Sequence, residues 1–251
     1  MRAKTFIGLS LLVAMSGCAA HRERFVWRVR DVVLGEAPVV DLKGTQDRIM
    51  ASIHRKTLQE LMLAHLRISR AAGIEADLLL VNGEEPNAFA GLFSDRRVIG
   101  VSLGMVKLIG DDINQYAALL GHEAAHWSKG HIDASSLRAN TLKVIGTVVG
   151  AGLGAAGVPA GGLITGVGLD LIDASFNRDQ ERDADAASVD YVIANNYDPQ
   201  GAITLFEKMM KNSSRFSLPF LSSHPSDQER IERFKALIES KRPPQSESAA
   251  H

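Results

Sequence analysis

The run from His122 to His126 restricts the fold of this chain more than any other part of its sequence. It reads His122-Glu123-Ala124-Ala125-His126. On a helix, residues i and i+4 lie on one face, so both imidazoles could reach one metal ion. Zn²⁺ accepts imidazole nitrogens at about 2.0–2.1 Å, and a neighbouring carboxylate can take a proton from water on its open side. We therefore expect a helix with two metal ligands, His122 and His126, and a catalytic base, Glu123.

The flanking residues predict that this helix is buried. Asp111 or Asp112 would begin it, and Gly130 would end it after Lys129. Two of its faces carry residues suited to burial, namely Gln115, Leu119, His122 and His126 on one and Ile113, Ala117, Leu120, Ala124 and Trp127 on the other. The alternative, two surface histidines near a helix end, does not fit flanks this apolar. The motif also arises by chance, so it needs a supporting third ligand.

That third ligand decides the class of site. A catalytic zinc has three protein ligands and one open position. In one large class the third ligand is a His six residues after the second, with a Gly between them, but Lys129 and Ile132 occupy those places here. Glu181 and Asp185 lie one turn apart on a later predicted helix, so Glu181 could bind the metal and Asp185 could orient a ligand imidazole. Other acids in the same run could be the third ligand instead. Spacing alone also does not exclude that the run is simply a charged, solvent-exposed helix.

Four segments together carry a family resemblance. They are Asn87-Ala88-Phe89-Ala90, the run from His122 to His131, Glu181 with Ala184-Asp185, and Ser223-His224-Pro225. In this order they resemble the zinc peptidases that include HtpX and the CAAX prenyl proteases, and most closely the soluble periplasmic branch of that family. The resemblance implies a mostly helical α+β fold, with a zinc-peptidase core whose small β-sheet packs on the active-site helix. It also implies a zinc metalloendopeptidase with one zinc per chain, and it favours Glu181 as third ligand.

Two further histidines and one strand are candidate site elements. By resemblance, His131 stands at the helix end in a structural role. His224 belongs to a His-Pro loop that lies near the active site in relatives, where it could touch the metal or the transition state; an ordinary loop histidine is the alternative. If His224 filled the open position, the enzyme would be latent. The strand from Asn87 to Ala90 could bind an extended substrate by main-chain hydrogen bonds, or could be a core strand with Phe89 inside.

The remaining pattern predicts further helices and short strands. Helices are expected at 45–72, 178–195, 201–211 and 226–240, strands at 76–81, 87–90 and 97–101, and a loop at 91–96. From Val144 to Leu169 the chain has no charged residue until Asp170, and Pro159 divides this Gly-rich stretch. We expect two close-packed helices there, or a hairpin that covers the cleft. A membrane span is the alternative, since the stretch is long enough.

The N-terminus resembles a bacterial lipoprotein signal. Arg2 and Lys4 precede a short apolar run, and Met15-Ser16-Gly17-Cys18 ends it. Cys18 would carry the lipid, and Ala19 favours sorting to the outer membrane. An ordinary signal peptide or an uncleaved anchor is the alternative. Since Cys18 is the single cysteine, no intrachain disulfide can form. The expected organisation is a signal peptide at 1–17, anchor and lead-in at 18–43, a peptidase domain at 44–240 and a disordered tail at 241–251.

The net charge and the predicted export signal together restrict the class of function that we expect. A formal net charge of -1 offers no general basic field for nucleic acid. We expect an endopeptidase that is lipid-anchored in the bacterial envelope, at the outer membrane and facing the periplasm. Its substrates would be unfolded or misassembled envelope proteins, and it could bind assembly partners there. Two rivals remain: a chaperone or assembly factor with a latent or structural zinc, and an integral-membrane protease that uses residues 144–169 as a span.

Overall fold

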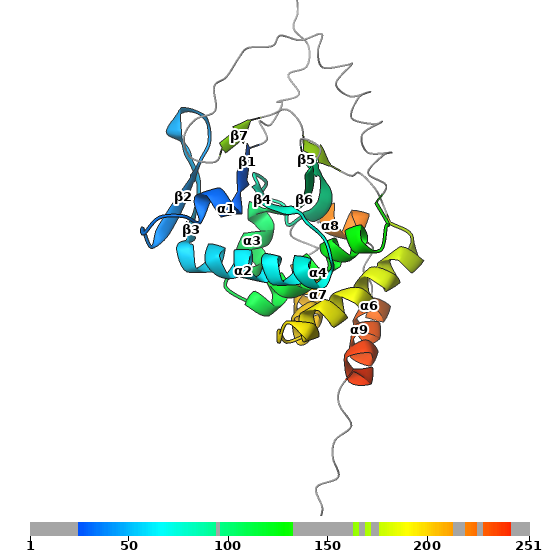
Figure 1. Ribbon diagram of the computed structural model, residues 1–251. Coiled ribbons are helices and arrows are strands. Elements are labelled where there is room, and N and C mark those ends of the chain that lie inside the picture. The colour runs from blue at the N-terminus through cyan, green and yellow to red at the C-terminus, as the bar shows by residue number, and fades with distance from the viewer. Residues whose placement is uncertain are drawn as a thin grey trace, which may run out of the picture.

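The computed structural model describes residues 25–93, 96–132, 163–165, 169–171, 176–212, 219–224 and 228–241. Cys18, the tail beyond Lys241 and most of the Gly-rich stretch lie outside these ranges. Within them, a twisted sheet lies against a layer of helices (Figure 1). The arrangement confirms the expected α+β fold, mostly helical, with a small sheet packed on the helix that carries the His122 motif.

The main sheet has the strand order β7-β1-β4-β6-β5-β8. Its strands are β1 (Phe25–Arg28), β4 (Asp77–Val81), β5 (Ala88–Phe93), β6 (Arg96–Ser102), β7 (Leu163–Thr165) and β8 (Leu169–Leu171). Only the β4–β6 pair among these is parallel, and the other neighbours are antiparallel. A separate antiparallel pair, β2 (Val39–Lys43) and β3 (Ile49–His54), stands beside the sheet in Figure 1.

The helices surround a central helix, α4. They are α1 (Val29–Val32), α2 (Arg55–Ala71), α3 (Leu103–Ile109), α4 (Ile113–Ser128), α6 (Arg178–Ala194), α7 (Gln200–Asn212), α8 (Pro219–Ser223) and α9 (Gln228–Ser240), with a 3-10 turn, η1, at Thr45–Asp47. Helix α4 contacts α2, α6, α7 and strands β5 and β6. It is therefore covered by helices and by the sheet.

The ends of α4 form as its sequence predicts. The Asp112 carboxylate accepts hydrogen bonds from the backbone N–H groups of Asn114 and Gln115, both at 3.1 Å. Gly130 follows the last turn with φ of 69°, a conformation that costs glycine little. Every residue from Gln115 to Trp127 is buried, which confirms the expected burial. Burial on all sides means that the polar side chains of α4 must find partners inside the protein.

The structure corrects three predictions for the N-terminal half. The helix expected at 45–72 begins only at Arg55, because residues 49–54 form β3. There Ile53 pairs with Val40 of the preceding strand, and both are buried, so pairing between these two successive strands outweighs the local helical spacing. The loop expected at 91–96 is also too long, since residues 91–93 and 96 continue β5 and β6. Residues 25–43, expected as a lead-in, contribute β1 to the sheet between β4 and β7.

The described parts of the Gly-rich stretch are strands. Leu163–Thr165 pairs with β1, and Leu169–Leu171 pairs with β5, at opposite edges of the sheet. The expected pair of helices is therefore wrong for these residues, and the rest of the stretch lies outside the described ranges. Among the helices that are described, none has the length and apolar character needed to cross a bilayer.

Small residues allow α6 to approach α4 closely. A Cβ at Gly121 would lie 2.6 Å from the Ser188 Oγ, nearer than real atoms pack. Instead, the Ser188 hydroxyl donates to the carbonyl of Ala118 at 3.0 Å. Ala125 and Ala184 are completely buried in the same contact. This close approach sets α6 beside the two histidines of α4.

Candidate metal centre

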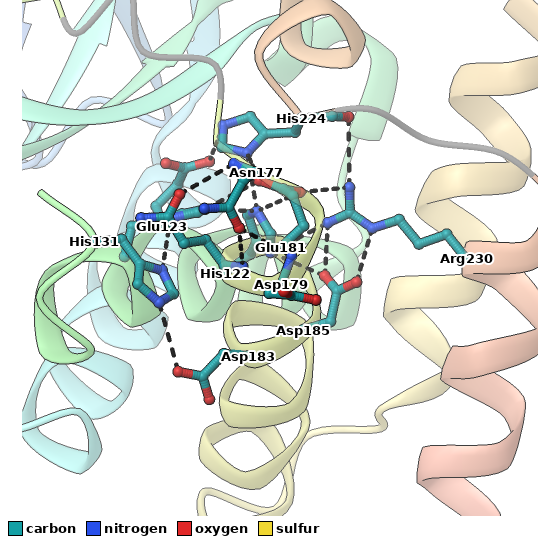
Figure 2. Close-up of polar contacts among 12 residues, drawn as sticks. His122, Glu123, His131, Asn177, Asp179, Glu181, Asp183, Asp185, His224 and Arg230 are labelled. Carbon is teal, nitrogen blue, oxygen red and sulfur yellow. Dashed lines mark hydrogen bonds and ion pairs between the residues drawn. The ribbon is translucent and has the colours of Figure 1, made fainter.

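Four side chains converge where α4, α6 and the end of α8 meet. One donor atom from each of His122, His126, Glu181 and His224 lies within 4.8 Å of all the others. Figure 2 shows His122, Glu181 and His224 pointing toward one another from these separate elements. All four residues are buried. The structure thus brings together the three ligands expected from sequence and adds His224 as a fourth donor.

The spacing of these donors fits a metal ion. Tetrahedral ligands at about 2.0–2.1 Å from zinc lie about 3.3–3.4 Å from one another. The Nε2 of His122 is 3.1 Å from the Nε2 of His126 and 3.1 Å from the Nδ1 of His224. The Oε1 of Glu181 is 2.9 Å from His224 Nδ1 and 3.5 Å from His126 Nε2. Three imidazoles and one carboxylate at these separations match the donor set that zinc prefers.

Glu123 lies beside this cluster without a hydrogen-bond partner. Its side chain is fully buried, and neither carboxylate oxygen has a partner among the described residues. The nearest cation-forming group is the Nε2 of His224, 3.6 Å from Glu123 Oε1. Burial raises the pKa of the Glu123 carboxyl. A buried carboxylate without a partner is costly to folding, and such groups concentrate where chemistry needs them.

Asp185 and Arg230 form a layer behind the ligands. The Oδ1 of Asp185 lies 3.0 Å from His122 Nδ1, the nitrogen that faces away from the cluster. The guanidinium of Arg230 meets the same carboxylate with Nε at 2.9 Å and Nη2 at 2.6 Å. Arg230 is completely buried. Asp185 therefore stands where it can hold the tautomer of His122 that leaves Nε2 free to bind metal.

Arg230 is a charged residue of this site that the sequence analysis did not predict. A sequence clue exists, because Arg230 lies four and eight residues before Phe234 and Ile238, on the buried face of α9. A charged residue on an apolar face of a helix needs an internal partner. The local sequence does not indicate that this partner is Asp185.

His131 lies behind the other ligand. Its Nδ1 is 3.1 Å from the Nδ1 of His126, and its Nε2 is 3.5 Å from Asp183. Lys129 also contacts Asp183, at 3.1 Å. These contacts tie the end of α4 to α6 and place His131 against the outer nitrogen of His126.

The protonation of the ligands follows from burial and from their neighbours. Burial lowers the pKa of His126 to about 2, so this imidazole is neutral and can donate an electron pair to a metal. Burial alone would raise the pKa of Glu181, but His122, His126 and His224 around the carboxylate lower it. Glu181 is therefore ionised, which is the form in which a carboxylate can bind a metal.

Two aromatic rings enclose the histidines. Phe176 stacks on His126 with ring centroids 3.6 Å apart and an interplanar angle of 24°. Phe220 stacks on His224 at 4.6 Å and 29°. The imidazole of His224 also lies 5.3 Å from Phe176, at 25°. The rings hold His224 over the cluster and provide an apolar surround, which strengthens electrostatic interactions within it.

The expected substrate strand lies in β5, next to α4. Ala88 and Ala90 are buried, Phe89 is half-buried, and Ala88–Ala90 pair with β6. Asn87, just before the strand, receives a hydrogen bond at its carbonyl from the backbone N–H of Ser102 at 2.9 Å. On the other side of β5, β8 pairs with Gly91–Phe93 and not with Ala88–Ala90. A role of this strand in substrate binding stays a prediction.

The fold and the site define a metallopeptidase. Its candidate metal site consists of two histidines on one helix and a glutamate on a later helix. Comparison with protein families agrees: residues 49–238 match the model of peptidase family M48. The chain belongs to this family, and with it to the peptidases that resemble HtpX and the CAAX prenyl proteases. Membership supports metal-dependent peptidase chemistry at the cluster.

Several characterised proteins are similar to this chain. Metalloprotease LoiP of Escherichia coli (strain K12) is 27% identical over 155 residues, covering 61% of this chain and 58% of LoiP. The Beta-barrel assembly-enhancing protease of the same organism is 24% identical over 212 residues, covering 80% and 42%. Mitochondrial metalloendopeptidase OMA1 of Schizosaccharomyces pombe is 28% identical over 196 residues, covering 76% and 56%. The chain thus spans about half the length of the relatives it matches.

Proposed function

We propose that this protein is a zinc-dependent endopeptidase that cleaves unfolded or misassembled proteins of the cell envelope. The observation that carries the proposal is the buried carboxylate of Glu123, which has no hydrogen-bond partner among the described residues and lies beside the converging donors of His122, His126 and Glu181. A site that only held a metal for structure would have no use for this costly carboxylate. Its presence favours proton transfer next to the metal.

Each residue has a defined part in peptide-bond hydrolysis. His122, His126 and Glu181 would hold the metal, which when bound supplies a Lewis acid that polarises the carbonyl and acidifies water. Glu123 takes a proton from the attacking water and passes it to the leaving amine, for which its raised pKa is suited. Asp185 keeps His122 in the tautomer that binds metal.

The proposed substrates and location rest on the strand, the N-terminus and the relatives. Pairing along Ala88–Ala90 would accept extended chains with little side-chain preference, as unfolded proteins require. One similar protein is named a Beta-barrel assembly-enhancing protease, which points to envelope proteins and assembly partners. We further propose that lipid on Cys18 anchors the protein to the outer membrane, facing the periplasm. Cys18 stands seven residues before β1, a short tether.

Removing the metal is expected to abolish cleavage. The full-length chain, purified in detergent, should cut reduced and alkylated lysozyme but not native lysozyme, because only the unfolded form offers an extended strand. Chelator treatment should stop this cleavage, and restoring about one zinc per chain should recover it. Cleavage that survives verified metal removal would refute the metal-dependent mechanism. Equal cutting of both lysozyme forms would refute the preference for unfolded chains.

A second function is favoured by the position of His224. Its Nδ1 lies among the other donors, where a catalytic zinc keeps an open position. Four protein ligands are the mark of a closed site, which is either latent or structural. The alternative is therefore a chaperone or assembly factor that binds unfolded envelope proteins and keeps its zinc closed.

Replacing His224 separates latency from a structural site. If His224 closes a catalytic site, His224→Ala should cleave unfolded lysozyme several-fold faster than wild type, because water and substrate gain the fourth position. Initial rates at equal zinc content measure this. His54→Ala, at an exposed position before α2, is the matched control. A slower variant would instead indicate that His224 assists the transition state, and no cleavage by either protein would favour the structural alternative.

A further inference from the structure

Arg230 makes more contacts with the metal-site residues than its place on the last helix suggests. Besides its two bonds to Asp185, its Nη1 lies 2.8 Å from Glu181 Oε2. The same Nη1 donates to the backbone carbonyl of His224 at 3.4 Å. Figure 2 shows the guanidinium reaching from α9 toward these three groups. One side chain thus touches the α6 carboxylates and the segment that carries His224.

The contact with Glu181 selects which oxygen faces the metal site. Arg230 holds Oε2, while Oε1 lies 2.9 Å from His224 Nδ1 and 3.5 Å from His126 Nε2. Oε2 pairs with the cation and also lies 3.6 Å from His122 Nε2, whereas Oε1 is the oxygen near the other two donors. This ion pair would favour Oε1 as the oxygen with which Glu181 binds the metal.

Arg230 reaches His122 directly, with Nη2 3.3 Å from His122 Nδ1, and also through Asp185. Asp185 Oδ1 accepts from Arg230 Nη2 at 2.6 Å and lies 3.0 Å from His122 Nδ1. A guanidinium that binds both oxygens of a carboxylate fixes its plane, which a lysine ammonium cannot do. Phe206 supports the guanidinium from its face, 4.4 Å from the ring centroid.

We infer that Arg230 is a positioning residue of the metal centre. It sets the oxygen with which Glu181 faces the metal, and through Asp185 it sets the ring orientation of His122. Its charge also offsets part of the negative charge of the two buried carboxylates, which would otherwise repel each other. The inference rests on the proposed metal ligands but not on peptidase activity.

Metal affinity tests this role without reference to cleavage. Zinc affinity would be measured by competition with a chromophoric chelator, and coordination by the visible spectrum of the cobalt-substituted protein. The full-length proteins would be wild type, Arg230→Lys, Asp185→Asn and the double variant. The matched control is Arg233→Met, a partly exposed arginine on the same helix that pairs with Glu229. Arg230→Lys keeps the buried charge, so the fold should survive.

We expect Arg230→Lys and Asp185→Asn each to weaken zinc binding by about 10–100-fold and to alter the cobalt spectrum. The double variant should be little worse than the single ones, because both changes break one link. Wild-type affinity and spectrum in Arg230→Lys would overturn the inference. If that variant does not fold, normal affinity in Asp185→Asn would overturn it instead. Loss of affinity with no peptidase activity in any protein would refute the proposed function and leave the inference standing.

Discussion

Glu123→Gln is expected to lower the rate of peptide cleavage by on the order of 10²–10⁴-fold, the usual contribution of a positioned general base. Glutamine fills the same volume but cannot accept the proton. Zinc content should stay at that of wild type, since Glu123 is not among the converging donors. The unfolding temperature should be equal or higher, because the substitution removes a buried carboxylate that has no partner among the described residues.

Three measurements on the purified variant check this result: zinc content, initial cleavage rate and thermal unfolding. Glu232→Gln is the control, since Glu232 is a solvent-exposed glutamate of α9. Full residual cleavage would remove Glu123 from the mechanism. Suppression of the aggregation of an unfolded envelope protein by Glu123→Gln, equal to that by wild type, would support a chaperone activity independent of cleavage.

Glu181→Ala is expected to lose metal rather than only activity. Changing a residue that merely orients a ligand costs about 10–100-fold in affinity, so removing a ligand should cost more than about 100-fold. The variant should also unfold at a lower temperature, because Arg230 loses the carboxylate at 2.8 Å and stays buried. Metal analysis after gel filtration, together with chelator competition, measures the loss.

The control for this variant is Asp179→Ala, which removes an exposed acid from the first turn of the same helix. It should keep wild-type zinc content. If Glu181→Ala also keeps its zinc, the third ligand lies elsewhere. Asp183 and Asp185, the other acids of this turn, would then be the next residues to replace.

The sequence could indicate which helix carries the candidate ligands because their spacing is local. The i and i+4 spacing of His122 and His126 becomes a shared helix face wherever a helix forms. The Asp112 cap and Gly130 delimit that helix from neighbouring residues alone. Glu181 needed the family resemblance, since several acids in its run had equivalent spacing.

Strand pairing was predicted less well. The apolar residues near Ile49 and Ile53 suited a helix by spacing, yet they form β3 because β2 lies beside them. The Gly-rich stretch gave no periodicity to distinguish helix from strand, and its described residues join strands on opposite edges of the sheet. The partners of these last strands, β1 and β5, are distant in sequence and leave no local trace.

The sequence by itself determined which groups are available for the proposed chemistry: two helical histidines, a glutamate between them and an acid on a later helix. Only the tertiary structure decided how these groups are arranged. It placed His224 among the donors, left Glu123 without a hydrogen-bond partner among the described residues, and set Arg230 against Asp185 and Glu181. The reason is physical: these contacts join residues more than 40 positions apart. They form only when Gly121 and the small residues of α6 let two helices pack closely, which local spacing cannot express.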